Sequence, residues 1–166
     1  GKKKMISAGG SHSLVVSGSM GKVWSFGYGY NGKLGHGGEE NEQVPRVIEA
    51  LARVVVIRVS AGNVHSIALA SNGDVFTWGV GLYGVLGHGN EENQRVPKKV
   101  EGIGATDITA GNLHSVAVVR GELYVWGYNY QGQLGLGDHV NYRVPTVVPG
   151  VSGITSVAAG SFHSLS

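Results

Sequence analysis

Four His-Ser pairs are the first residues in this chain whose types could do chemistry. Each pair lies in the pattern Ala-Gly-x-x-His-Ser, and the histidines are 53, 49 and 49 residues apart. They are His12, His65, His114 and His163. Imidazole beside a serine hydroxyl is the base and nucleophile of many hydrolases. Adjacent strand residues point to opposite faces, so a His and the Ser after it cannot share a hydrogen bond. We therefore predict no catalytic residues and no enzymatic activity.

The same histidines could also be metal ligands. One His per repeat would converge only if all of them pointed toward a common axis, and no local ligand spacing supports that arrangement. We instead predict a structural role, in which each imidazole bonds a backbone group of its own or the next repeat. His36 and His88 align with Leu136, so their position does not require imidazole and we expect them in loops. No metal and no cofactor is expected.

The segments 27–32 and 79–84 match the pattern Gly-x-Gly-x-x-Gly of dinucleotide-binding sites. That chemistry needs a strand before the pattern and a helix after it, so that the helix N-terminus meets the pyrophosphate. No helix-forming run follows here, and the third copy has Asn129 in place of a glycine. We interpret these glycines as a corner that every repeat turns.

The elements that carry these motifs are short strands. In the second repeat, strands are expected at 54–60, 65–70 and 75–78, with a hairpin turn at Asn72-Gly73. A fourth segment, 95–100, contains Pro97, which favours an outer edge. Only 47–53 could form a helical turn. Four strands per unit of about 50 residues predict an all-β fold, a β-propeller.

We expect a single propeller repeat domain over residues 1–166, with three full blades and part of a fourth. The predicted units are 5–53, 54–104, 105–153 and the partial unit 154–166. Trp24, Trp78 and Trp126 occur once per unit, 54 and 48 residues apart, and we interpret them as one strand position that packs between blades. Structural roles are also predicted for three loop glycines, Gly35, Gly87 and Gly135.

The composition excludes several classes of function. The net charge is +2 and 14% of residues are charged, so direct nucleic-acid binding is not expected. The chain has no cysteine, which excludes disulfides. It has no apolar run long enough to cross a membrane, and the N-terminal lysines are interpreted as the entry to a strand. These features favour an intracellular protein, cytoplasmic or nuclear.

The ordered motifs Ala-Gly-x-x-His-Ser, Trp-Gly with Leu-Gly-x-Gly, and Val-Pro resemble the repeat of the regulator of chromosome condensation family. The resemblance covers residues 5–166. It implies a propeller, usually of seven blades, that serves as a protein-interaction module in larger proteins. The family's namesake is a guanine-nucleotide exchange factor for the small GTPase Ran and binds chromatin, so a small GTPase is an alternative partner. A third hypothesis is that the chain is a fragment or an engineered repeat array. In that case we expect it to close a ring by self-association, as a dimer.

Two groups of residues are candidates for partner binding. The first occupies the two positions before a marker His, which hold the functional Trp and Arg in a plant photoreceptor of this family. They are Asn63, Val64, Asn112, Leu113, Ser161 and Phe162, none of which is Trp or Arg, so photoreception is not expected. The second group forms acidic loop tips, at positions where exposed loops on a rigid scaffold bind partners. They are Glu39, Glu40, Glu91 and Glu92.

Overall fold

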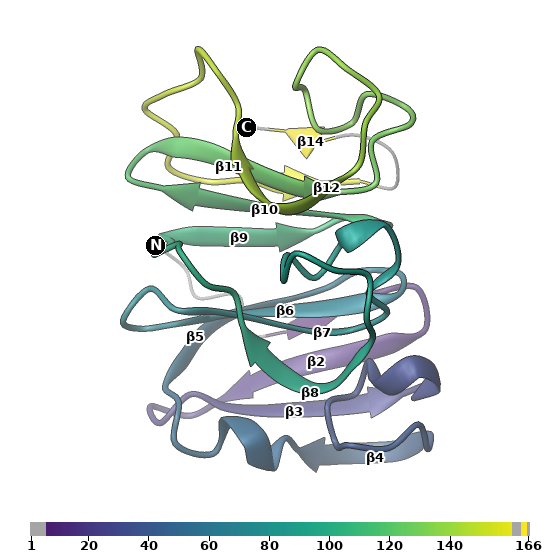
Figure 1. Ribbon diagram of the computed structural model, residues 1–166. Coiled ribbons are helices and arrows are strands. Elements are labelled where there is room, and N and C mark those ends of the chain that lie inside the picture. Colours follow the sequence, from purple (N-terminus) through teal and green to yellow (C-terminus); the bar gives the residue numbers. More distant parts are fainter. Residues whose placement is uncertain (1–5, 161–163, 166) are drawn as a thin grey trace.

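Each repeat forms its own four-stranded antiparallel sheet in the computed structural model, which describes residues 6–160 and 164–165 (Figure 1). The first sheet consists of β1 (Ile6–Ala8), β2 (His12–Ser17), β3 (Lys22–Gly27) and β4 (Glu42–Val47). The second consists of β5 (Val56–Ala61), β6 (His65–Ala70), β7 (Val75–Gly79) and β8 (Gln94–Lys99). The third consists of β9 (Asp107–Ala110), β10 (His114–Val119), β11 (Glu122–Gly127) and β12 (Tyr142–Val147). A two-stranded sheet of β13 (Ala158–Ala159) and β14 (Ser164–Leu165) follows.

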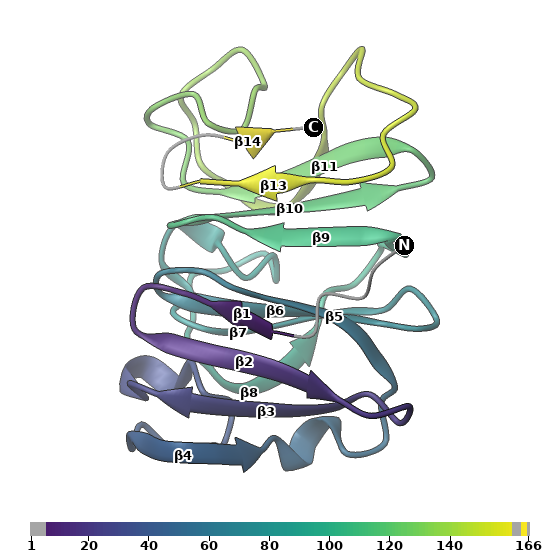
Figure 2. The ribbon, with the colours of Figure 1, turned by 180° about the vertical axis from the view of Figure 1, so that it is seen from behind.

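Within each full sheet the strands are ordered as they occur in the chain, and the sheets stack one on another (Figure 2). The first strands β1, β5 and β9 lie next to one another, while β4, β8 and β12 each pair with one strand only. These are the inner and outer strands of propeller blades, and the blades do not close into a ring. The predicted all-β propeller fold is confirmed. Pro97 lies in the outer strand β8, where its missing N–H is tolerated.

A glycine with positive φ ends the third strand of every full blade. Gly27, Gly79 and Gly127 have φ of 110°, 108° and 106°. At each of them the register with the outer strand shifts. A Cβ on Gly79 would lie 2.7 Å from the carbonyl oxygen of Val64. The glycine is therefore needed both for the bulge and for the close approach of the backbone.

Within the described residues, three short 3-10 turns connect the strands, η1 (Tyr30–Gly32), η2 (Glu49–Leu51) and η3 (Leu82–Gly84). The segment 47–53, the helical candidate of the sequence, contains η2, which buries Leu51 between the first two blades. None of the helical turns in the described part of the chain has the length or the apolar character to span a bilayer.

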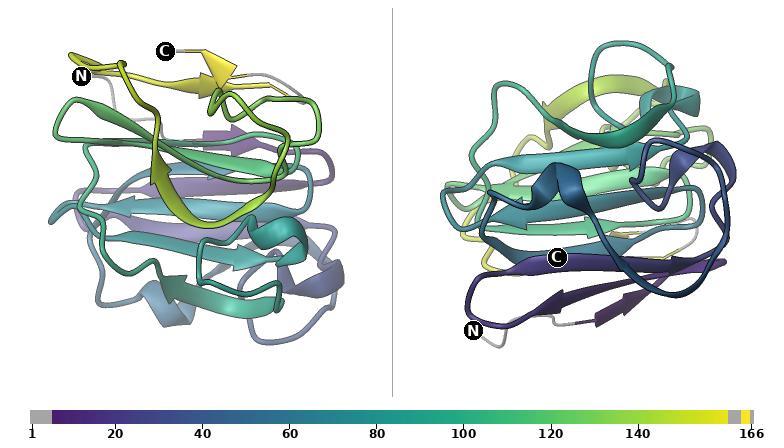
Figure 3. Two further views of the ribbon diagram at one scale, coloured as in Figure 1. Left: turned by 45° about the horizontal axis from the view of Figure 1, so that its top comes forward. Right: turned by 90° about the horizontal axis from the view of Figure 1, so that it is seen from below.

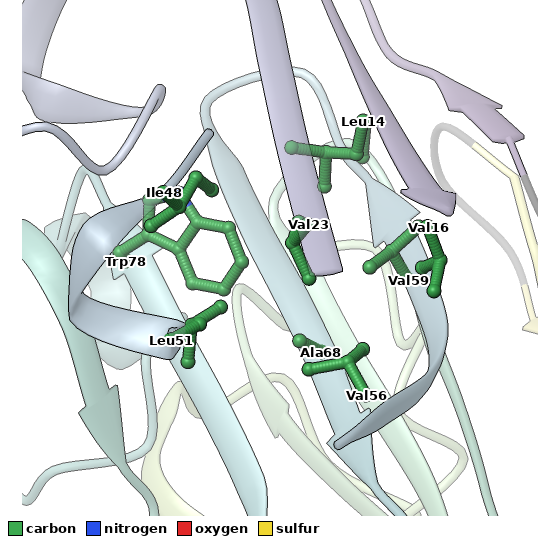
Figure 4. Close-up of a cluster of buried hydrophobic side chains, with 10 residues drawn as sticks. Leu14, Val16, Val23, Ile48, Leu51, Val56, Val59, Ala68 and Trp78 are labelled. Carbon is green, nitrogen blue, oxygen red and sulfur yellow. The ribbon is translucent and has the colours of Figure 1, made fainter. Parts of the chain in front are cut away.

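A tryptophan of one blade packs on a loop glycine of the blade before it. Trp78 and Trp126 are fully buried. Trp78 belongs to a cluster that joins the first two blades, beside Ile48 and Leu51 (Figure 4). A Cβ on Gly35 would lie 3.0 Å from Trp78 Nε1, and a Cβ on Gly87 would lie 2.9 Å from Trp126 Nε1.

Trp24 does not share this strand position, and the interpretation of three equivalent tryptophans is wrong. Ser66 and Ser115 pair with Trp78 and Trp126, whereas the corresponding Ser13 pairs with Phe26. Trp24 lies two residues earlier, is half-buried, and donates its indole N–H to Ser17 Oγ at 2.8 Å. The corner glycines align the repeats correctly, because they mark the end of the same strand.

The substitution Gly87→Ala tests the packing of tryptophan on glycine. We expect a loss of about 3–4 kcal/mol in the free energy of unfolding, because the methyl group would overlap Trp126 and because φ is +80°. Gly135→Ala is the matched control. It has φ of +70° at the same loop position, but its Cβ would have only Val148 Cγ1 as a neighbour, at 4.0 Å. The control should lose about 1–2 kcal/mol, from the backbone alone. Equal losses in urea titrations would contradict the packing argument.

Candidate interaction face

The turns between the first two strands of each blade lie at the same end of the sheets as the long loops that follow the third strand. Backbone bonds join them, from Tyr28 N to Ser11 O at 2.9 Å, from Val80 N to Val64 O at 3.1 Å, and from Tyr128 N to Leu113 O at 2.9 Å. We name this end the loop face. It comprises turns 9–11, 62–64 and 111–113 and loops 28–41, 80–93 and 128–141. The short hairpins between second and third strands lie at the opposite end (Figure 3).

The marker histidines tie each blade to the next through a serine hydroxyl. His12 Nε2 lies 2.8 Å from Ser66 Oγ, and His65 Nε2 lies 2.9 Å from Ser115 Oγ. The partner is thus a side chain of the following blade, which corrects the expected backbone partner. The serine is the one that follows the next marker histidine, so the repeat supplies both halves of the contact. His114 is buried as well, and His163 lies outside the described residues.

The direction of these hydrogen bonds is fixed by a third group. Ser66 Oγ donates to the carbonyl of Lys33 at 2.9 Å. The hydroxyl has one proton, so it must accept from His12, and Nε2 of His12 carries the hydrogen. Burial lowers the pKa of His12 to about 4, and the nearby Lys33 charge lowers it further by a smaller amount. Burial also lowers the pKa of His65, to about 3. The imidazoles are neutral donors that do not act as bases toward serine.

The described residues contain no group of three or more His, Cys, Asp or Glu that could hold a metal ion. The imidazoles of His65 and His114 instead lie against the glycine of their own turn. A Cβ on Gly62 would lie 2.9 Å from His65 Nδ1. The glycine in Ala-Gly-x-x-His-Ser is explained by this contact.

Side chains of the inner strands also bond the next blade, which the sequence analysis missed. Ser7 Oγ accepts from Ala61 N, and Ser60 Oγ accepts from Ala110 N, both at 3.0 Å. In the third blade, Asp107 accepts from Val157 N at 3.0 Å and forms an ion pair with Arg58 of the second blade. Arg58 and Asp107 occupy equivalent repeat positions, and their opposite charges were the available signal.

His36 and His88 lie in loops, as expected, but they also bond the third strand of their blade. His36 Nε2 lies 2.8 Å from Ser25 Oγ, and His88 Nε2 lies 3.0 Å from Thr77 Oγ1. The third repeat replaces the pair with Val125 and Leu136, which pack in its core. A hydroxyl and an imidazole are exchanged together for two apolar side chains, and this joint change was visible in the sequence.

The structure brings the described partner-binding candidates to the loop face. Asn63 and Asn112 line a hollow of about 260 Å³ near the inner strands. Most of its wall is backbone, from Gly9, Gly10, Gly62, Gly111 and Gly160. Val64 and Leu113 are half-buried in the same turns. Ser161 and Phe162 lie outside the described residues.

The acidic candidates lie on the long loops and differ in their contacts. Glu39 forms an ion pair with Arg95 at 3.5 Å, and Glu91 forms one with Arg143 at 2.9 Å, each across to the next blade. These two carboxylates therefore join blades as well as facing solvent. Glu40 and Glu92 are exposed.

Tyrosines that the sequence analysis did not select are prominent on the loop face. Tyr28, Tyr30 and Tyr130 have exposed fractions of 47%, 55% and 56%. Tyr83 has φ of 61°, which is strained for a bulky residue, and its ring centroid lies 4.8 Å from that of Tyr128. The first and third repeats share tyrosine at the positions of Tyr28 and Tyr30, where the second has Val80 and Leu82, and this pattern was the signal that could have identified them.

Comparison with known proteins confirms the resemblance found in the sequence. The family model described as "Regulator of chromosome condensation (RCC1) repeat" matches residues 20–69, 72–118 and 120–166. Human E3 ubiquitin-protein ligase HERC2 is 47% identical over 87 residues, which are 52% of this chain and 2% of that protein. The ultraviolet-B receptor UVR8 of Arabidopsis thaliana is 42% identical over 86 residues, which are 52% of this chain and 19% of the receptor.

Among solved structures, Prp20p from Saccharomyces cerevisiae, described with its binding properties to Gsp1p and histones, superposes with a TM-score of 0.87. The two are 25% identical, and the match covers 96% of this chain and 42% of the yeast chain. The chain thus spans less than half the length of these relatives.

The buried histidines predict a loss of stability in mild acid. In the unfolded chain these histidines bind protons near pH 6.5, whereas in the folded chain His12 and His65 remain neutral at that pH. The free energy of unfolding is therefore highest above pH 6.5 and falls as the pH drops toward 4. We expect roughly 2 kcal/mol of loss per histidine between pH 6.5 and 5, measured by urea unfolding. His65→Gln, which keeps a donor for Ser115, should flatten this dependence. The exposed His139→Gln should leave it unchanged. An unaltered slope in His65→Gln would reject the assignment.

Proposed function

Because this chain belongs to the regulator of chromosome condensation (RCC1) repeat family, we propose that it is a non-catalytic protein-interaction module whose loop face binds the partner. One observation carries the proposal. Exposed aromatic and apolar side chains of the loop face, Tyr28, Tyr30, Leu82 and Tyr130, stand at positions where the second repeat differs from the first and third, with Val80 for tyrosine and Leu82 for tyrosine. Residues that repeat hold the blades together, so residues that vary at exposed positions are free to recognise a partner.

Site-specific photo-crosslinking tests which face binds. A photoreactive amino acid replaces Tyr30 on the loop face or, as a matched control in the same blade, Met20, which is 71% exposed in the hairpin at the opposite end. We expect one partner to crosslink through position 30 and not through position 20. The partner is then purified and its affinity measured. A Tyr30→Ala, Tyr130→Ala double variant should bind at least about tenfold more weakly. Crosslinking through position 20 alone would contradict the proposal.

A second candidate is exchange of guanine nucleotide on a small GTPase, which is favoured by the superposition on Prp20p and its described binding to Gsp1p. Exchange needs no acid–base residue, since it follows from tighter binding of the nucleotide-free GTPase. Release of fluorescent GDP from a Ran-type GTPase is the measurement. Acceleration supports the activity, and an unchanged rate with the chain in large excess rejects it.

We also propose that the isolated chain self-associates, with a dimer as the expected form. Phe26 is partly exposed at the strand position where Trp78 and Trp126 are fully buried, so the outer flank of the first blade carries exposed apolar surface. Light scattering over a dilution series gives the mass in solution and should precede the binding assays. A mass of one chain at all concentrations would refute self-association.

A further inference from the structure

Lys33 is a buried cation without a carboxylate partner among the described residues. It is 7% exposed, whereas the other described lysines and arginines that lack an ion pair are exposed to solvent. Its ammonium donates to Ser11 Oγ at 2.8 Å and lies 4.9 Å from the centroid of the Tyr28 ring. Burial lowers the pKa of Lys33. A hydroxyl and a ring face compensate only part of the lost hydration of an ammonium group.

The propeller scaffold does not require a lysine at this position. The equivalent residues of the second and third repeats are Val85 and Gln133, both buried in the same loop. The contact between blades at this position is made by the main chain, because the carbonyl of Lys33 accepts from Ser66 and that of Val85 accepts from Ser115. The ammonium is therefore a feature of the first blade alone.

The surroundings of Lys33 are suited to a ligand that approaches from the loop face. Ser11 is exposed and follows Gly10, which lines the glycine-walled hollow near the inner strands. The Tyr28 ring stands beside the ammonium and is stacked on Tyr30, with ring centroids 6.1 Å apart and about half of each tyrosine exposed. The inner turns of this face carry no charged residue, and the acidic residues lie on the outer parts of the loops. An incoming carboxylate would meet one cation, one hydroxyl and no nearby acid in the inner turns.

We propose that Lys33, with the Ser11 hydroxyl and the Tyr28 ring, binds the carboxylate of an Asp or Glu side chain of the protein partner. The inference rests on the proposed interaction function and adds the chemistry of the partner. The carboxylate supplies the counter-ion that Lys33 lacks among the described residues, and the Tyr28 ring covers the aliphatic stem of the partner's side chain. Charge-assisted hydrogen bonds of this kind are about twice as strong as neutral ones.

Fluorescence anisotropy on the full chain at low salt tests this directly. The probe is a labelled peptide with an amidated C-terminus, in which an Asp-Glu pair is flanked by Gly and Ser; its control has Asn-Gln instead. We expect the carboxylate peptide to bind at least about tenfold more tightly than the amide peptide. A third peptide, without acidic residues but with a free C-terminus, should bind as weakly as the amide peptide. Tighter binding of this third peptide, or equal binding of the first two, would overturn the proposal.

Substitutions taken from the chain's own repeats supply the variants. Lys33→Gln and Lys33→Val copy the third and second repeats, and both should reduce affinity to that of the amide peptide while melting at the same or a higher temperature. Lys22→Gln removes an exposed lysine at the other end of the same sheet and should leave binding unchanged. Full binding by Lys33→Gln, equal weakening by Lys22→Gln, or a clearly lower melting temperature of both Lys33 variants would overturn the assignment.

Failure of this proposal is distinguishable from failure of the proposed function. If crosslinking through position 30 persists in Lys33→Gln protein with undiminished partner affinity, the loop face binds but Lys33 does not recognise the partner. If crosslinking through position 30 is absent from the unmodified chain, the interaction function itself is rejected.

Discussion

Two buried serine hydroxyls, Ser66 and Ser115, join the three full blades to one another, and the remaining structure depends on these contacts. Ser66 accepts a hydrogen bond from His12 and donates one to the carbonyl of Lys33, so a single side chain of the second blade holds both a strand and a loop of the first. Ser115 does the same with His65 and Val85. Each bond contributes only about 1 kcal/mol, but an unmade bond would leave a buried polar group unsatisfied. These hydrogen bonds therefore fix the relative position of adjacent blades more specifically than the apolar contact between the blades does.

This constraint explains the residue types of the repeat. The imidazole of His65, which bonds the next blade, lies against its own turn, where a Cβ on Gly62 would come within 2.9 Å of His65 Nδ1. Only glycine leaves room for it. A hydrogen on Nε2 is also required, because Nε2 must donate to a hydroxyl whose own proton is already donated to a carbonyl. The burial that lowers the pKa of His65 keeps the imidazole in its neutral form at neutral pH.

The sequence was sufficient to predict what is local and repeated. The period, the strand alternation and the Asn72-Gly73 turn led to four-stranded blades, and Pro97 correctly marked an outer strand. The sequence was not sufficient to predict the contacts between two neighbouring repeats. The partner of His12 is 54 residues away, and it is found only when one blade is rotated onto the next. Trp24 was misassigned because counting tryptophans ignored the corner glycine, which fixes the strand register. The surroundings of Lys33 depend on Ser11 and Tyr28, which come together only when the loop folds over the first turn.

The same hydroxyl contact makes the joining of the blades independent of the side chains on the loop face. Serine binds the main-chain carbonyl of residues 33 and 85, and a carbonyl is present whatever the side chain is. The side chains at this position, Lys33, Val85 and Gln133, can therefore differ from blade to blade without loss of the contact that joins the blades. The argument extends to the strained Tyr83, whose loop is held by backbone bonds from Gly84 N to Gly81 O and from Gly87 N to Gly84 O. Because this scaffold relies on glycine and on backbone groups, the exposed side chains of the loop face can vary without weakening the contacts between the blades.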